Sequence, residues 1–167
     1  MTTLREGDIE IELLSGARGR KFDDARHGLS HCMKAVDFII ELKDRILFVE
    51  IKDPESSAAP DTRREEFVRQ FQAGEIDRAL AGKYRDSFLY EWAAQRLEKP
   101  VHYLVLVAIS SLDPAMLLAR TDALKRELPF QGPSNGAWTR RLAEGCVVFN
   151  LDAWTHMAGF PVSRRKA

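Results

Sequence analysis

The sequence predicts an α/β domain with a central mixed β-sheet that contains an antiparallel hairpin or meander and is flanked by helices. Apolar runs at 9–14, 34–42 and 46–52 follow one another without an intervening long helix, as strands of an antiparallel meander do. A long helical pattern at 62–98 comes next, and later apolar runs alternate with helical patterns, which is typical of parallel strands added to the same sheet. With 167 residues, 45% hydrophobic and 30% charged, the chain suits one globular domain over 1–167.

The first part of the chain contains the three strands of the expected meander. Residues 9–14 alternate apolar and acidic side chains, the pattern of a half-buried strand. Residues 15–30 are polar and contain glycine, so we expect a loop or a short helix there. The strands near 34–42 and 46–52 are separated by a short polar break, and the turn-rich stretch 53–61 predicts a linker.

The helical region at 62–98 has an apolar stripe with mostly four-residue spacing. Asp61 is the expected N-cap, and the Lys-Pro pair at 99–100 is the expected end. Gly74 and Gly82 weaken the helix, so we expect it to bend or split at one of them. The stripe consists of Phe67, Phe71, Leu80, Tyr84, Phe88 and Trp92.

The last third of the chain alternates strands and helices. Residues 101–110 form a continuous apolar run, which is typical of a buried central strand. Asp113 followed by Pro114 matches an N-cap and first helical position, and predicts a helix to about residue 128. We further expect one or two helical turns at 137–144, a strand at 146–151, a helix at 152–159 and a basic tail at 163–167.

Composition excludes several classes of protein. Basic and acidic residues number 25 each, so no overall positive field favours sequence-independent binding of nucleic acid. No apolar run reaches the ~20 residues of a membrane helix, and the first residues lack the apolar core of a secretory signal. Cys32 and Cys146 lack a CxxC spacing, which indicates a reducing compartment. We therefore expect a cytoplasmic protein without a membrane partner.

Polar residues interrupt both strands of the expected hairpin. A two-residue turn at Lys43 and Asp44 pairs Leu42 with Arg45, and counting outward places Asp37 opposite Glu50; a three-residue turn would not. Alternation then predicts one apolar face and one polar face. The apolar face has Val36, Phe38, Ile40, Leu47, Val49 and Ile51, and the polar face has Asp37, Ile39, Phe48, Glu50 and Lys52.

Two neighbouring carboxylates repel each other unless a cation lies between them. Carboxylate oxygens, completed by water and substrate phosphate, suit Mg²⁺, for which Mn²⁺ would substitute. Lys52, on the same face as Asp37 and Glu50, is placed to stabilise charge on a phosphate or to orient water. The plainer alternative is a solvent-exposed sheet face on which Lys52 neutralises the acids in a surface ion pair.

The segment "VDFI", followed along the chain by "EIK", resembles the signature of the PD-(D/E)XK phosphodiesterase superfamily. Asp37, Glu50 and Lys52 match its acidic and lysine positions. The resemblance implies a restriction-endonuclease-like fold, whose core would cover roughly 9–110. It also implies a Mg²⁺-dependent nuclease that hydrolyses DNA, or RNA as the less expected substrate, with a metal-activated water. In that scheme Asp37, Glu50 and the main-chain carbonyl of Ile51 bind the metal, and Lys52 acts on the reacting phosphate.

The chain also departs from the family pattern, because no helix is expected before residues 9–14. That helix often carries a further acidic residue, for which Glu12 is the favoured candidate. Relatives also place a polar residue, often Gln or Lys, on the helix after the tripeptide, and Gln70 or Gln72 would serve here. Residues two apart diverge on a helix, so only one of the two glutamines can face the site. The other candidates for the acidic position are Glu10, Asp23 and Asp24.

Two other functions remain open. The first is a catalytically silent binding or assembly module, which the balanced charge and the missing first helix favour. The second is a nuclease subunit of a larger complex, because the chain has no room for a separate DNA-recognition domain. Cleavage of both strands by a small nuclease usually requires two sites, so by analogy we expect a homodimer. A basic surface around Asp37 would favour a nuclease, and an acidic or apolar one a partner surface.

Overall fold

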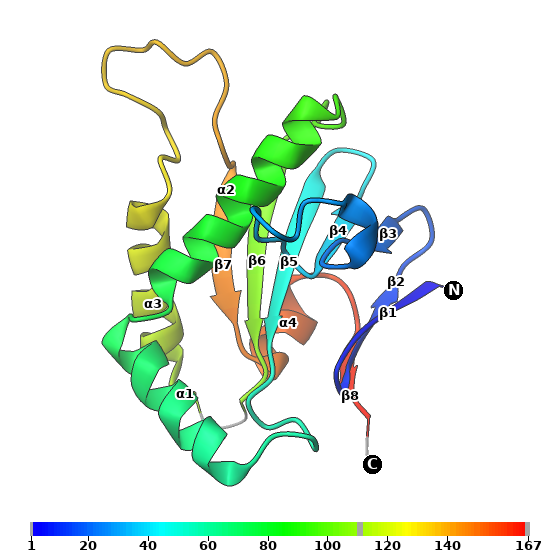
Figure 1. The fold of residues 1–167 in the computed structure, drawn as a ribbon, viewed down its shortest axis with the longest axis vertical. Coiled ribbons are helices and arrows are strands. Elements are labelled where there is room, and N and C mark those ends of the chain that lie inside the picture. The colour runs from blue at the N-terminus through cyan, green and yellow to red at the C-terminus, as the bar shows by residue number, and fades with distance from the viewer. Residues whose placement is uncertain (1, 110–111, 166–167) are drawn as a thin grey trace.

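The computed structural model describes residues 2–109 and 112–165. Its main sheet has the strand order β3-β4-β5-β6-β7 (Figure 1). The first three strands are antiparallel, and β6 and β7 are parallel to β5. The strands are β3 (Arg18–Lys21), β4 (Phe38–Glu41), β5 (Ile46–Lys52), β6 (Val101–Val107) and β7 (Gly145–Phe149).

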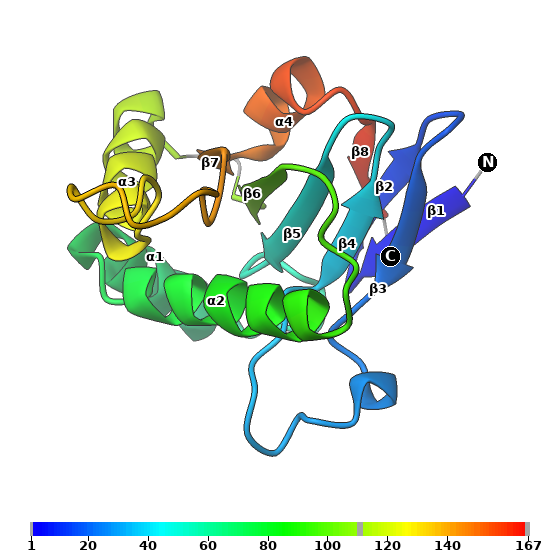
Figure 2. The ribbon, with the colours of Figure 1, turned by 90° about the horizontal axis from the view of Figure 1, so that it is seen from above.

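Helices lie on both faces of this sheet (Figure 2). Helices α1 (Asp61–Ala73), α2 (Asp77–Ala93) and α3 (Pro114–Glu127) pack on one face. The other face is covered by α4 (Leu151–Met157) and by a small antiparallel sheet of order β1-β2-β8. The small sheet consists of β1 (Thr2–Glu6), β2 (Ile9–Leu13) and β8 (Val162–Arg164), and a short 3₁₀ helix, η1 (Ala25–His27), follows β3. The mixed sheet flanked by helices is confirmed.

Alternation along the central strands separates two apolar cores. Ile39, Phe48 and Val105 pack against the α1–α3 side. Phe38, Val49 and Leu106 pack against α4 and the small sheet. The central strands are therefore buried on both faces, as strands between two layers must be.

The first strand of the meander differs from the prediction. Residues 9–13 form the expected half-buried strand β2, but this strand belongs to the small sheet. The meander instead begins with β3, in the stretch that predicted a loop or short helix. The sequence of β3, "RGRK", has no apolar residue, so its strand conformation depends on backbone pairing with β4 at the sheet edge.

The long helical region is two helices. Gly74 ends α1 with φ 76°, and its N–H donates to the carbonyls of Gln70 and Phe71. Left-handed glycine is a common helix end, so the split falls at one of the two predicted glycines. Gly82 lies inside α2. Asp61 is the first helical residue rather than the N-cap, which is Pro60, and α2 ends at Ala93, before the Lys-Pro pair.

The remaining elements agree in most places with the prediction. Asp113 caps α3, accepting from the N–H of Ala115 (2.9 Å), and Pro114 is the first helical residue. Residues 137–144 are not helical, and part of the expected basic tail is β8, which pairs with β2. Residue 110 of the expected strand and residues 166–167 of the tail lie outside the described residues. Across the described ranges, no helix has the length and apolarity that crossing a bilayer demands.

Candidate active site

The hairpin that carries the candidate residues has the predicted register. The N–H of Leu42 donates to the carbonyl of Arg45 (2.9 Å), which closes the two-residue turn. Strand pairing then runs from Glu41 with Ile46 to Phe38 with Val49. Asp37 immediately precedes β4, so the same register places it across from Glu50.

The polar face of the hairpin is buried under the helices, so a solvent-exposed face is wrong, although the ion pair of Lys52 with an acid that the same alternative expected is present. Glu50 has no exposed surface, and Asp37 is 5% exposed. Val36 also differs from the prediction. It packs in the helix-side core instead of sharing a face with Phe38, and its N–H donates to Ser87 Oγ (3.0 Å). The reason is that regular pairing with β5 begins only at Phe38, so strict alternation does not extend back to Val36.

Backbone hydrogen bonds fix Asp37 beside the end of β5. Its carbonyl accepts from the N–H of Phe22 (2.8 Å), and its carboxylate Oδ2 accepts from the N–H of Ile51 (2.6 Å). The carbonyl of the next residue, Lys52, accepts from Ala108 on the β6 side (2.8 Å). Because the N–H and C=O of one strand residue point to the same side, the Ile51 carbonyl faces the Asp37 side.

Two lysines converge on one oxygen of Glu50. The ammonium of Lys52 lies 2.7 Å from Glu50 Oε1, and that of Lys83, on α2, lies 2.8 Å from the same atom. Lys83 also lies 3.9 Å from Asp37 Oδ1 and 3.7 Å from Asp23 Oδ2. Lys83 therefore connects three carboxylates through one charged group.

Sequence reasoning missed Lys83. A signal was present, because Lys83 interrupts the buried stripe of α2 between Leu80 and Ser87. A lysine on a buried helix face requires a carboxylate partner, and the facing strand supplies Glu50.

The charges shift the protonation of the site. Burial, together with the nearby Glu50 carboxylate, raises the pKa of Asp37 to about 7. Burial lowers the pKa of Lys83, but the carboxylates of Glu50, Asp37 and Asp23 outweigh it, so the net pKa lies above the ordinary value. Lys83 is therefore a permanent cation, whereas Asp37 titrates near neutral pH.

A second buried glutamate shows how a purely structural carboxylate is satisfied. Glu91 on α2 is 2% exposed, and Arg20 and Arg96 donate hydrogen bonds to both of its oxygens. In contrast, Glu50 Oε2 is buried and has no hydrogen-bond partner in the part of the chain that the structure describes, a property it shares with Asp77 Oδ1 at the start of α2. An unsatisfied buried carboxylate oxygen is costly and needs an explanation.

The predicted metal ligands are all oxygen atoms. Asp37 lies across from Glu50 in the hairpin register, and the Ile51 carbonyl follows Glu50 along β5. Mg²⁺ usually takes one or two carboxylates plus waters and phosphate. Within residues 2–109 and 112–165, no group of three or more His, Cys, Asp or Glu is arranged to hold a metal. Asp23, Asp37 and Glu50 meet at Lys83 instead. Two carboxylates and one main-chain carbonyl are thus the oxygen atoms that the predicted metal site would use.

The structure does not bring the predicted accessory residues to this place. Glu12 is exposed on β2 of the small sheet, opposite Thr3. Gln70 donates to Glu66 (3.1 Å) along α1, and Gln72 is exposed. Because the helix breaks at Gly74, the helix that reaches Glu50 is α2, and its polar residue is Lys83.

A cleft of about 650 Å³ opens beside the lysines. Its basic lining residues are Lys34, Lys52, Arg63 and Lys83. Its two acidic lining residues, Glu6 and Asp53, are already paired with Lys21 and Arg164. The surface next to Glu50 is therefore basic although the chain has no net charge. No protein-family model, curated protein or solved structure matches this chain.

Proposed function

We propose that this protein is a metal-dependent phosphodiesterase that hydrolyses nucleic acid, with DNA preferred over RNA. The observation that carries the proposal is Glu50, a fully buried carboxylate with two lysines on Oε1 and nothing bonded to Oε2 among the described residues. Buried charge with perturbed neighbours beside a cleft is typical of a functional site. The basic cleft supports a phosphate-containing substrate.

Each residue of the group has a role in this proposal. Asp37, Glu50 and the Ile51 carbonyl would hold Mg²⁺, which when bound supplies a water of lowered pKa and positive charge at the phosphate. Lys52 is 31% exposed and lines the cleft, so it can contact a phosphate oxygen and stabilise charge that develops there. Lys83 balances the second carboxylate and orients Glu50.

The order of elements supports a restriction-endonuclease-like fold as part of the proposal. An antiparallel meander, β3-β4-β5, is followed by helices and by the parallel strand β6. The departure expected from the sequence remains, because the described chain before β3 forms the strands β1 and β2 and no helix. Asp23 takes the place of the additional acidic residue better than Glu12 does, because it contacts Lys83.

A catalytically silent binding module is the second candidate. Lys83 favours it, because its ammonium already lies 2.8 Å from Glu50 and neutralises charge without a metal. A nuclease subunit in a larger complex and a homodimer remain proposals for a duplex substrate, since one site cuts one strand.

Metal-titrated cleavage assays on single-stranded, duplex and branched DNA and on RNA test the first candidate. Lys52→Ala should reduce cleavage about 10²- to 10³-fold and retain the Mn²⁺-induced rise in melting temperature. Asp37→Ala should lose both the cleavage activity and the Mn²⁺-induced rise in melting temperature. Lys43→Ala, in the exposed turn of the same hairpin, is the matched control and should behave as wild type.

Two results would contradict the proposal. A Lys52→Ala protein that cuts at the wild-type rate removes the catalytic role of Lys52. A wild type that cuts no substrate and shows no melting shift with Mg²⁺ or Mn²⁺ favours the silent module.

A further inference from the structure

The cleft beside Glu50 has two chemically different walls. Lys52 and Lys83 form the end next to the carboxylates. Phe67, Ile76 and Leu80, from α1, α2 and their junction, contribute an apolar wall. A ligand that fills this cleft must therefore combine an anionic group with a flat or apolar part.

Phe67 contributes an aromatic ring to the apolar wall. Its ring is stacked on Phe71 with centroids 6.0 Å apart and an interplanar angle of 15°. Phe71 is completely buried, so the ring of Phe67 is supported from behind while Phe67 itself is only partly buried and lines the cleft. Supported aromatic rings bind nucleobases of any sequence by stacking.

The size of the cleft selects between forms of nucleic acid. About 650 Å³ lies within the ~300–1,000 Å³ of pockets that enclose one small molecule. An unpaired nucleotide fits this space, whereas a base inside a duplex is stacked and paired and reaches such a wall only if it is flipped out.

Charge in the cleft complements a phosphodiester chain. Lys34 and Arg63 line the cleft and form no ion pair within the part of the chain that the structure describes. The acids Glu6 and Asp53 are neutralised by their own partners. Lys34 and Arg63 are thus available to phosphates on either side of a bound base, and Lys52 and Lys83, although paired with Glu50, add positive charge to the same cleft.

We infer that this cleft binds an unpaired nucleotide of a single-stranded nucleic acid, with the base on Phe67 and a phosphate at Lys52 and Lys83. The inference rests on the proposed function and specifies its substrate class. It also removes the need for two sites, because a single strand is cut by one.

Binding of labelled oligonucleotides in EDTA, where no metal-dependent cleavage occurs, tests the inference directly. Wild type should bind a single-stranded DNA at least ~10-fold more tightly than a blunt duplex of the same sequence. Phe67→Ala should weaken single-strand binding roughly 5- to 150-fold, the usual range for one base stacked on one ring. Phe67→Trp should retain binding, because it keeps an aromatic face.

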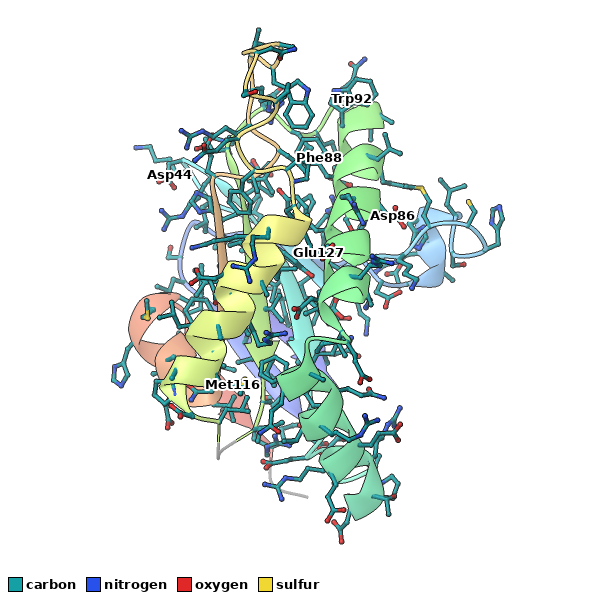
Figure 3. All side chains as sticks on the ribbon, turned by 90° about the vertical axis from the view of Figure 1, so that its left-hand side faces the viewer. Asp44, Asp86, Phe88, Trp92, Met116 and Glu127 are labelled. Carbon is teal, nitrogen blue, oxygen red and sulfur yellow. The ribbon has the colours of Figure 1, made fainter. Side chains whose placement is uncertain are left out.

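Controls separate stacking from loss of folding and from general charge. Trp92→Ala removes an aromatic side chain that is 60% exposed, at the end of α2 away from α1 (Figure 3), and should leave binding unchanged. Arg63→Ala should reduce the slope of log affinity against log salt by about 0.7 for a single strand.

Thermal melts of each variant confirm that the protein is folded. RNA of the same sequence shows which sugar is preferred.

Equal or tighter binding of the duplex, or single-strand binding unaffected by Phe67→Ala, would overturn the inference. Duplex cleavage by the same proteins in separate assays with Mg²⁺ or Mn²⁺ would still support a nuclease. Absence of binding to every oligonucleotide also overturns the inference. Tight single-strand binding without hydrolysis in Mg²⁺ or Mn²⁺ supports the inference and counts against the proposed function.

Discussion

Glu50 is the residue around which the other charged side chains are arranged. Two ammonium groups contact one of its oxygens, and Asp37 lies across from it in the hairpin register. Removing a single partner of a buried charge is costly, because the remaining charge is left uncompensated. Substitutions of Asp37 and Lys83 should therefore have effects on stability that differ in sign.

Asp37 should make the metal-free protein less stable as pH rises. Its pKa is raised from 3.8 to about 7 in the folded state, so its favourable contribution is complete below about pH 4 and is lost as pH rises through 7. This difference in pKa corresponds to a change of roughly 4 kcal/mol in the free energy of unfolding. Asp37→Asn should abolish this loss and be the more stable protein at pH 8.

Urea unfolding of both proteins in EDTA between pH 4 and 8 measures the effect. The pH-dependent contributions of the other titrating groups cancel when the unfolding free energy of one protein is subtracted from that of the other. Parallel pH profiles for wild type and Asp37→Asn would show that Asp37 has an ordinary pKa.

Lys83→Met should destabilise the metal-free protein by about 3 kcal/mol, because it leaves the buried carboxylates with one lysine fewer. Lys34→Met is the control. Lys34 lines the same cleft without an ion pair in the described chain, so its substitution should stay within about 0.5 kcal/mol. Millimolar Mn²⁺ should raise the melting temperature of Lys83→Met more than that of wild type, because the metal replaces the missing cation. Equal rises in the melting temperature of the two proteins would show that Lys83 is not part of the metal site.

At the scale of elements, the break between α1 and α2 decides which side chain reaches Glu50. Gly74 adopts φ 76°, and a Cβ there would lie 2.1 Å from Arg120 Nη1 and 3.1 Å from Asp77 Oδ2. Arg120 and Asp77 are themselves paired at 2.8 Å. The turn is therefore fixed both by its own backbone conformation and by an ion pair between α2 and α3.

Two glycine substitutions should have opposite effects on stability. Gly74→Ala should destabilise by about 1–3 kcal/mol, because it strains a left-handed residue and displaces Arg120. Gly82→Ala, inside α2 with nothing within 4 Å of the added Cβ, should stabilise by about 0.5–1 kcal/mol. The midpoints of urea unfolding of both variants measure these effects. Changes in stability of the same sign and size at Gly74 and Gly82 would contradict the assigned helix break.

At the scale of the whole molecule, the two ends of the chain support the loop that follows Lys52. Arg164 of β8 lies 2.7 Å from Asp53 Oδ1 and donates to the carbonyl of Ala108 (2.7 Å). Asp8, in the turn between β1 and β2, accepts from the N–H of Ser57 (2.6 Å). The small sheet thus holds one wall of the cleft in place.

Arg164→Leu should destabilise by roughly 2–3 kcal/mol, because Asp53 loses its partner while largely buried. It should also speed amide hydrogen exchange over residues 53–59. The neighbouring Arg165→Leu is the control, since Arg165 is 54% exposed and should change stability by about 0.5 kcal/mol or less. Unchanged exchange in Arg164→Leu would mean that the loop is held by other contacts.

The sequence by itself determined the features that depend on a few neighbouring residues. The register of the hairpin followed from side-chain alternation and a short turn, and it placed Asp37 opposite Glu50. The cap of α3 followed from Asp113 and Pro114 in the same way. Within these segments the polar pattern also located the face that carries Asp37, Glu50 and Lys52.

Only the tertiary structure decided the features that depend on distant partners. The strand β3 has no apolar residue, and its conformation depends on its pairing with β4. The strand β8 pairs with β2, although the two strands lie near opposite ends of the sequence. Lys83 reaches Glu50 because the chain breaks at Gly74 and α2 packs across the sheet, which no local periodicity encodes. Burial of the polar face, and with it the raised pKa of Asp37, likewise depends on helices that follow the hairpin in the sequence, because desolvation is a property of the assembled layers.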